Sequence, residues 1–327
     1  MPFIDYNIDE LTLGGAKMLS IFKSAENGQL SKLESIEPGC WVNMIDPSAE
    51  ELVFVSKNTN VPMDFLKAAL DEEETSRIDI EDCTLIILDI PFTDMDDNSL
   101  TYDTYPLSII HTENVIITVC LKNSKVLSDF SEGKISSFFT FKRSRFMLQV
   151  LYRIANYYLI YLRQIDKKSY IVEKQLHKSL RNKELLQLLA LEKSLVYFST
   201  SLKGNELTLE KMIKLDILQR YEEDKDVLED VIIENRQAIE MCTIYSNILS
   251  GTMGAYASVI SNNLNIVMKL LAAITIVMAI PNMISGLFGM NVPVPFQTNA
   301  LGFWYVAALI GVIGILVIYF LNRKDMF

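Results

Sequence analysis

The sequence is poor in the side chains from which many enzymes and metalloproteins build their sites. It has only two histidines, His111 and His177, so it offers no zinc-type ligand cluster. Its four cysteines are widely spaced in apolar contexts, which predicts buried, reduced thiols in a reducing compartment. It also lacks a phosphate-cradling glycine-rich loop and a nucleophile elbow. We therefore expect a protein that is not an enzyme.

Positive charge is also scarce. Lysine and arginine number 30 against 41 aspartates and glutamates, which gives a net charge of −11. This balance argues against a nucleic-acid partner, because such proteins need a basic surface. It is compatible with cations as ligands. The first residues carry acids and no apolar signal-peptide core, so we expect no cleaved leader.

The longest stretch without any charged residue lies near the C-terminus. No charged residue occurs between Lys269 and Arg323. A membrane-spanning helix needs about 20 apolar residues, so this stretch suits two crossings joined by a short turn. We place the spans at residues 266–288 and 301–321.

The first span is not uniformly apolar. Counting back from Asn291 by threes and fours, small and polar residues share one face of the predicted helix. The face carries Gly289, Gly286, Asn282, Met278, Thr275, Leu271, Met268 and Asn265. Polar side chains in a membrane helix face protein or a water-filled cavity, so the face suits a helix–helix contact or a pore wall. The closeness of Pro281 and Asn282 to the terminal Gly-Met-Asn favours the pore.

The C-terminal region resembles the CorA family of magnesium channels. The resemblance rests on a first span that closes in Gly289-Met290-Asn291, Phe288 just before it, a short proline-containing loop, a second span and a small basic tail. The stretch Trp41–Pro47, followed by two glutamates, is also similar to the family's strand–proline–helix pattern. The resemblance implies a funnel-shaped homo-oligomer, a homopentamer.

The remaining chain predicts an α/β domain and a helical stalk. Apolar runs at residues 19–22, 41–45, 84–90, 107–111 and 115–121 predict strands, and helices are expected to start at Ser48 and Pro62. A helical pattern from residue 141 is expected to break at Gly204-Asn205, and a second pattern continues into the first span. We divide the chain into a cytoplasmic α/β domain (1–140), long stalk helices (141–265) and two C-terminal transmembrane helices (266–327).

Two spans cannot enclose a pore alone, so the first span is expected to line a ring of subunits. Gly289, Met290 and Asn291 are the predicted selectivity filter, whose neutral oxygens would hold hydrated Mg²⁺ without gripping it. The predicted pore-lining residues are Asn282, Met278, Thr275 and Gly286. Leu271 and Met268 are the predicted hydrophobic gate, because apolar constrictions close by dewetting.

The predicted function is uptake of Mg²⁺ driven by the membrane potential. Co²⁺ and Ni²⁺ remain possible substrates, and no cofactor is expected besides Mg²⁺ as substrate and regulatory ligand. The family resemblance implies closure by cytoplasmic Mg²⁺. The acids considered for that site are Asp94, Asp96 and Asp97, expected in a loop after the strand 85–89, and the acidic run at residues 222–226. A plain solvated loop is the alternative.

Two other functions stay open. One is transport of zinc or another divalent cation within the same superfamily, and the other is a non-conducting, membrane-anchored sensor or scaffold. The lysines and arginines flank the ends opposite the loop 292–298, so the positive-inside rule predicts a multi-pass protein of the cell inner membrane with both termini cytoplasmic. Its expected partners are the lipid bilayer, divalent cations and further copies of itself.

Overall fold

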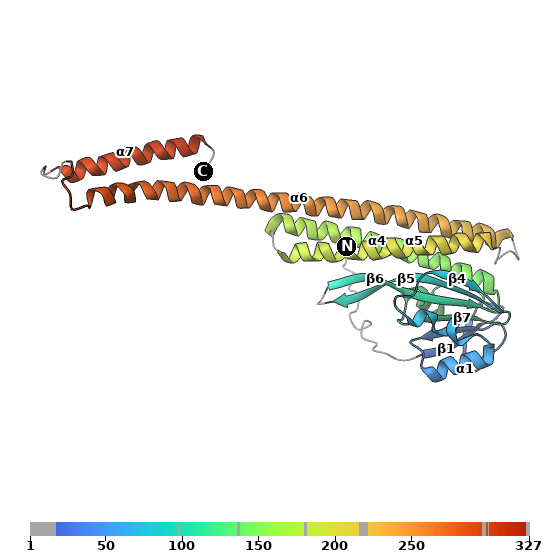
Figure 1. The fold of residues 1–327 in the computed structure, drawn as a ribbon. Helices are drawn as coiled ribbons and strands as arrows, with labels where there is room; N and C mark the ends of the chain where they lie inside the picture. Colours follow the sequence, from blue (N-terminus) through green and yellow to red (C-terminus); the bar gives the residue numbers. More distant parts are fainter. Residues whose placement is uncertain are drawn as a thin grey trace. The chain divides into compact units, whose positions relative to one another are not determined.

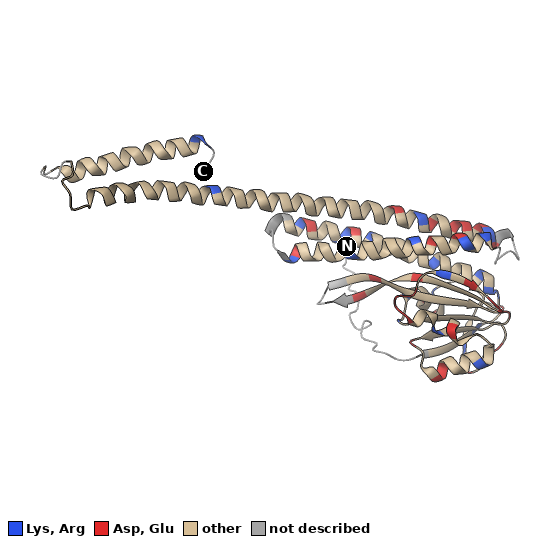
Figure 2. Cartoon of the chain, in the orientation of Figure 1, with Lys and Arg blue, Asp and Glu red and all other residues tan. Residues whose placement is uncertain are grey.

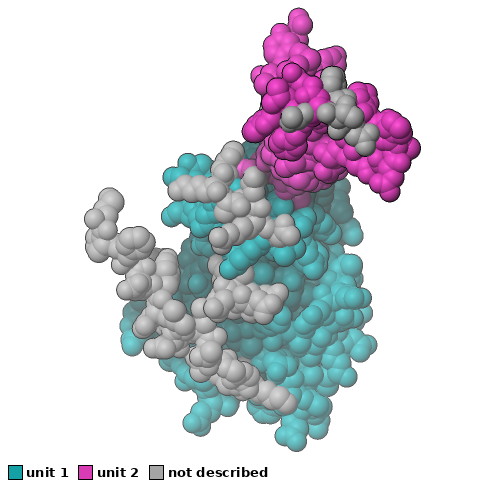
Figure 3. Space-filling view, turned by 90° about the vertical axis from the view of Figure 1, so that its left-hand side faces the viewer, with its two compact units in different colours: residues 1–250 teal, residues 251–327 magenta. Residues whose placement is uncertain are grey.

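The structure is a computed structural model of the 327-residue chain. It describes residues 18–96, 99–135, 138–179, 182–215, 222–295, 299 and 301–324. The described chain forms two compact units, residues 1–250 and 251–327 (Figure 3). The boundary falls within one helix, α6 (Glu222–Phe288), which therefore contributes to both units.

A seven-stranded mixed sheet organises the first unit (Figure 1). Its spatial order is β2-β1-β3-β7-β6-β5-β4, and only β3 and β7 pair in parallel. The strands are β1 (Met18–Ser24), β2 (Leu30–Leu33), β3 (Trp41–Ile45), β4 (Arg77–Ile80), β5 (Thr84–Asp96), β6 (Ser99–His111) and β7 (Ile116–Cys120). All five predicted strands are confirmed. The two that were not predicted, β2 and β4, are four-residue edge strands whose residues are mostly half-exposed, so they carry no apolar run to detect.

Four short elements accompany the sheet: α1 (Ala49–Thr59), α2 (Met63–Lys67), the 3₁₀ turn η2 (Ala68–Leu70) and α3 (Lys125–Ser131). The first three pack against a face of the sheet, because their buried apolar side chains share one core cluster with strand residues such as Val42 and Ile87. The predicted start at Ser48 is confirmed, because its side chain accepts a hydrogen bond from the Glu51 amide while Glu51 accepts one from the Ser48 amide. The four cysteines are buried and free. Burial raises the pKa of Cys120 to about 12, so its thiol stays protonated.

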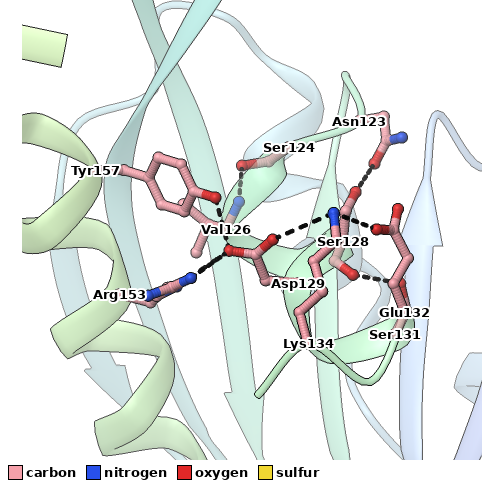
Figure 4. A network of polar contacts seen from close by, with 10 residues as sticks. All are labelled: Asn123, Ser124, Val126, Ser128, Asp129, Ser131, Glu132, Lys134, Arg153 and Tyr157. Carbon is pink, nitrogen blue, oxygen red and sulfur yellow. Dashed lines mark hydrogen bonds and ion pairs between the residues drawn. The ribbon is translucent and has the colours of Figure 1, made fainter. Parts of the chain in front are cut away.

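A buried polar network fastens α3 to the first long helix, α4 (Arg143–Ser179) (Figure 4). Asp129 is 5% exposed and accepts hydrogen bonds from Arg153 at 2.6 and 3.1 Å and from the Tyr157 hydroxyl at 2.6 Å. Lys134 adds a longer ion pair at 3.8 Å. A buried carboxylate is tolerable when it is paired and hydrogen-bonded in this way.

The second long helix, α5 (Asn182–Lys214), runs through the predicted break at Gly204-Asn205, so that prediction is wrong. Both residues serve contacts to the sheet. A Cβ on Gly204 would lie 3.4 Å from the Ser76 hydroxyl oxygen, an ordinary van der Waals contact, so Gly204 packs beside the residue just before β4. The Asn205 side chain accepts from the Asp89 amide (2.9 Å) and donates to the Asp89 carbonyl (2.8 Å). It thereby replaces a neighbouring strand beside Asp89, because β4 begins only at Arg77, opposite Ile87.

The N-terminal part of α6 is fastened to α4 and α5, which lie beside it (Figure 1). Asp224, 4% exposed, pairs with Arg145 at 3.1 Å. The Asn235 amide donates to the Leu202 carbonyl at 3.0 Å, and the Cys242 thiol contacts the Leu195 carbonyl at 3.0 Å. Ser250 donates to Glu192. These contacts make α5 antiparallel to α6.

The predicted acidic loop is not a loop at its start. Asp94 and Asp96 lie in β5, where their backbones pair with Thr101 and Ser99 of β6. The strand continues past residue 89 because β6 offers a partner over its whole length. Asp97 lies outside the described residues.

Candidate ion pathway

The second unit consists of the C-terminal part of α6 and of α7 (Gly302–Arg323). Both helices are long and apolar enough to cross a membrane. Figure 2 shows this unit almost without charged residues, apart from Lys269 on α6 and the basic end of α7. The helix α6 ends at Phe288, the predicted end of the first span, and α7 covers the predicted second span, whereas the predicted start of the first span at residue 266 lies inside α6.

Each of the two helices of this unit covers one face of the other. From residue 273 to the end of α6, the buried or half-buried positions are Ala273, Val277, Ile280, Pro281, Ile284 and Phe288, most of them three or four residues apart. On α7 they are Gly302, Val306, Ile310, Ile313, Gly314, Val317 and Leu321. Side chains with this spacing lie on a single face, so these are the faces that α6 and α7 turn toward each other.

The face of small and polar residues predicted to line the pore, which we call the stripe, lies on the other side of α6. At about 100° per residue it centres roughly opposite Ala273 and its neighbours. All its members are exposed in the single chain, including Met278 (64%), Met268 (58%) and Leu271 (54%). The structure thus keeps these side chains together on a face that α7 does not cover.

The polar residues of the stripe differ in whether their side chains already make a hydrogen bond within the chain. The Thr275 hydroxyl donates to the Leu271 carbonyl at 2.8 Å, so its proton is committed to its own helix while its oxygen can still accept. Asn282 is exposed and makes no hydrogen bond with another described side chain or backbone group. Its amide group can therefore bind a water molecule or a second chain. A Cβ on Gly286 would meet no atom within 4 Å.

The predicted filter begins where α6 ends. The Gly289 amide donates to the Ser285 carbonyl at 2.9 Å, and the Met290 amide approaches the Leu287 carbonyl at 3.4 Å. A Cβ on Gly289 would lie 3.2 Å from that Ser285 oxygen, so glycine allows this tight closure. Asn291 follows in the turn, exposed. Ser285 is the residue that the stripe did not reveal, because its contribution is a backbone carbonyl.

The predicted regulatory acids are not assembled in one chain. Asp94 is exposed on β5, and the side chains of Asp96 and Asp97 lie outside the described residues. Among the side chains that the structure describes, no group of three or more His, Cys, Asp or Glu residues is placed to hold a metal ion.

Comparison with known proteins identifies this architecture. The family described as CorA-like Mg²⁺ transporter protein matches residues 37–323. A cobalt/magnesium transport protein, CorA, from Methanocaldococcus jannaschii is 28% identical over 324 residues, which covers 94% of this chain and 99% of that protein. The complete structure of the CorA magnesium transporter from that organism matches with a TM-score of 0.80 and 26% identity, covering 95% of this chain and 99% of the other.

A more distant structure shares the fold. The full-length CmaX protein matches with a TM-score of 0.68 and 16% identity, covering 96% of this chain and all of the other. The family match spans most of the sequence and includes the sheet, the long helices and both apolar helices. The chain therefore belongs to the CorA-like Mg²⁺ transporter family.

Proposed function

We propose that this chain forms a homo-oligomeric ring, a pentamer, in which the stripe of α6 lines a pore for Mg²⁺. One observation carries the proposal: the small and polar stripe lies opposite the α7-facing side of α6 and ends at Gly289-Met290-Asn291. One chain leaves this face exposed. A ring of copies would give it a water-filled lumen, which is where polar side chains inside a membrane belong.

In this ring, Asn291 and nearby carbonyls would form the outer filter. Mg²⁺ sheds its bound water reluctantly, so neutral amide oxygens suit an ion that keeps its hydration shell. Binding through water is strong enough to select and weak enough to release. Asn282, Met278, Thr275 and Gly286 would line the wall below it.

Leu271 and Met268 would close the pore when their apolar rings exclude water. In this proposal the protein lies in the cell inner membrane with both termini on the cytoplasmic side, so the membrane potential would drive the uptake of cations. It supplies about 2.3 kcal/mol per charge at 100 mV, and about double that for a divalent ion.

The test is cation flux into vesicles that contain the purified full-length protein. Wild type should take up Mg²⁺, and Asn291→Leu should abolish uptake while assembly and thermal stability are kept. Asn322→Leu, the same exchange at the far end of α7, is the matched control and should transport normally. Parallel assays with Co²⁺, Ni²⁺ and Zn²⁺ identify the substrates. Normal uptake by assembled Asn291→Leu would exclude the filter, and no flux of any cation through wild type would favour the non-conducting sensor or scaffold.

We further propose that cytoplasmic Mg²⁺ closes the ring by binding between copies, with Asp94, Asp96 and Asp97 as the acids. Mg²⁺ prefers carboxylate oxygens, and a site shared between copies needs few acids from each. The measurement is protease resistance with and without millimolar Mg²⁺, for wild type and for the variant with all three acids changed to Asn. Equal protection of both proteins would show that these acids are not the sensor.

A further inference from the structure

Positive charge is concentrated in one part of this acidic protein. Residues 163–183 contain seven lysines and arginines and only two acids, although the whole chain carries a net charge of −11. This segment is the end of α4 and the start of α5. Nothing in the proposed pore or its regulation uses this charge.

The described side chains of this segment combine charge with exposed apolar groups. On α4, Lys167, Tyr170, Ile171 and Lys174 are spaced to share one face, and all four are exposed, Tyr170 to 65%. Together with Lys183 at the start of α5, they form what we call the basic hairpin surface. Lysines beside exposed aromatic and aliphatic side chains are typical of helices that lie against a membrane surface. Lys168 is not part of it, since it is half-buried and burial lowers its pKa.

The direction of the hairpin follows from contacts within the first unit. Arg145, near the start of α4, pairs with Asp224 at the start of α6, whereas Glu192 of α5 accepts from Ser250 further along α6. The basic hairpin surface therefore lies at the end of the α4–α5 pair nearest to Ser250, the last residue of the first unit.

Chain length limits how far this surface can lie from the bilayer. A helix rises about 1.5 Å per residue, so α6 needs ~24 Å from residue 250 to reach the span at residue 266. From residue 192 to residue 183, α5 covers a further ~14 Å. Chain length therefore keeps this surface within a few tens of ångströms of the point at which α6 would enter a bilayer.

We propose that the basic hairpin surface binds the anionic lipid headgroups of the cytoplasmic leaflet of the bilayer. The cytoplasmic leaflet carries the anionic lipids, so the inference rests on the topology in the proposed function. The competing occupant is a second, equally acidic copy of the chain. The exposed Tyr170 and Ile171 between the lysines favour lipid, because aromatic and aliphatic side chains beside basic ones suit the boundary of headgroups and acyl chains.

The test is hydrogen–deuterium exchange of the full-length protein in vesicles of pure phosphatidylcholine and in vesicles with about 30% phosphatidylglycerol in both leaflets. Exchange over residues 163–176 and 183–190 should slow several-fold with the anionic lipid and recover in 0.5 M NaCl. The triple variant Lys167→Gln, Lys174→Gln and Lys183→Gln should lose this protection. Its matched control is the triple variant Lys32→Gln, Lys57→Gln and Lys67→Gln. These three lysines are also exposed in the first unit but lie outside the hairpin, so the control should keep the protection.

Each other outcome would overturn the proposal. Equal exchange in both kinds of vesicle would show that anionic lipid does not bind there. Protection that follows the protein-to-lipid ratio instead of the phosphatidylglycerol content would identify a second copy as the occupant. Mg²⁺ flux is measured in the same vesicles, and the triple variant should retain it. A wild type that conducts nothing would defeat the proposed function while the lipid result is still read from exchange.

Discussion

The two parts of α6 differ in where their polar side chains find hydrogen-bond partners. Up to Ser250, its polar side chains bind α4 and α5 of the same chain, as in the contacts of Asp224, Asn235 and Cys242. Beyond Gly251, Thr275 bonds only its own helix, and Asn282 has no partner in the described part of the chain. The comparison teaches that the first part is stabilised by contacts within its own chain, whereas the second part leaves a mainly apolar surface and a polar stripe that its own chain does not cover.

The largest expected effect tests the second part. Leu271→Ser adds a hydroxyl to the proposed apolar gate, which should wet the constriction and raise the basal flux several-fold at high internal Mg²⁺. The measurement is Mg²⁺ flux in loaded vesicles. Leu270→Ser is the matched control, because Leu270 is also exposed but lies off the stripe, and it should leave the flux unchanged. A flux that stays the same or falls in Leu271→Ser would contradict a gate at this level.

An intermediate effect tests the first part. Asn235 is 2% exposed, and its side-chain amide donates a second hydrogen bond to the Leu202 carbonyl, which already accepts one within α5. Asn235→Ala should lower the free energy of unfolding by about 0.5–1.5 kcal/mol, because it removes a buried hydrogen bond between two helices. Thermal unfolding in detergent measures this.

The comparison becomes sharper with two controls for Asn235→Ala. Thr243→Ala removes an exposed hydroxyl that bonds only the Ile239 carbonyl of its own helix, and should change stability by less than about 0.5 kcal/mol. Asn282→Ala should leave the unfolding of the soluble unit unchanged and reduce transport. If Asn235→Ala and Asn282→Ala destabilised the soluble unit equally, the distinction between the two parts of α6 would fail.

The smallest expected effect concerns Asp89, on β5 beneath α5. Burial raises the pKa of its carboxyl, against the opposing effect of a hydrogen bond with Ser201. A raised pKa in the folded state means that the charged form costs stability above that pKa, and that this cost disappears as the pH falls through it. Asp89→Asn should therefore raise the melting temperature slightly at neutral pH, and the gain should shrink in acid.

The exposed Asp82→Asn is the control for this pH dependence and should show no such trend. A gain in Asp89→Asn that is independent of pH would show that the charge of Asp89 is not the cause. The measurement is the difference in melting temperature between each variant and wild type over a pH series.

Much of the fold could be predicted because strong local patterns carry it. The strands with continuous apolar runs, the capped start of α1 and both membrane spans followed from such patterns. The edge strands β2 and β4 could not, since four half-exposed residues give no periodic signal. The continuation of α5 through Gly204-Asn205 could not either, because the stabilising partners of those residues are Ser76 and Asp89, more than a hundred positions away in the sequence.

The sequence by itself determined that the protein has two charge-free spans, a small and polar stripe on the first of them, and a terminal Gly-Met-Asn. These are properties of residue type and helical period, which need no tertiary contact. Only the tertiary structure decided which face of α6 meets α7 and which stays exposed, and that Asp94 and Asp96 belong to a long strand. Burial and strand pairing depend on which distant segments meet in space, and no local pattern in the chain contains that information.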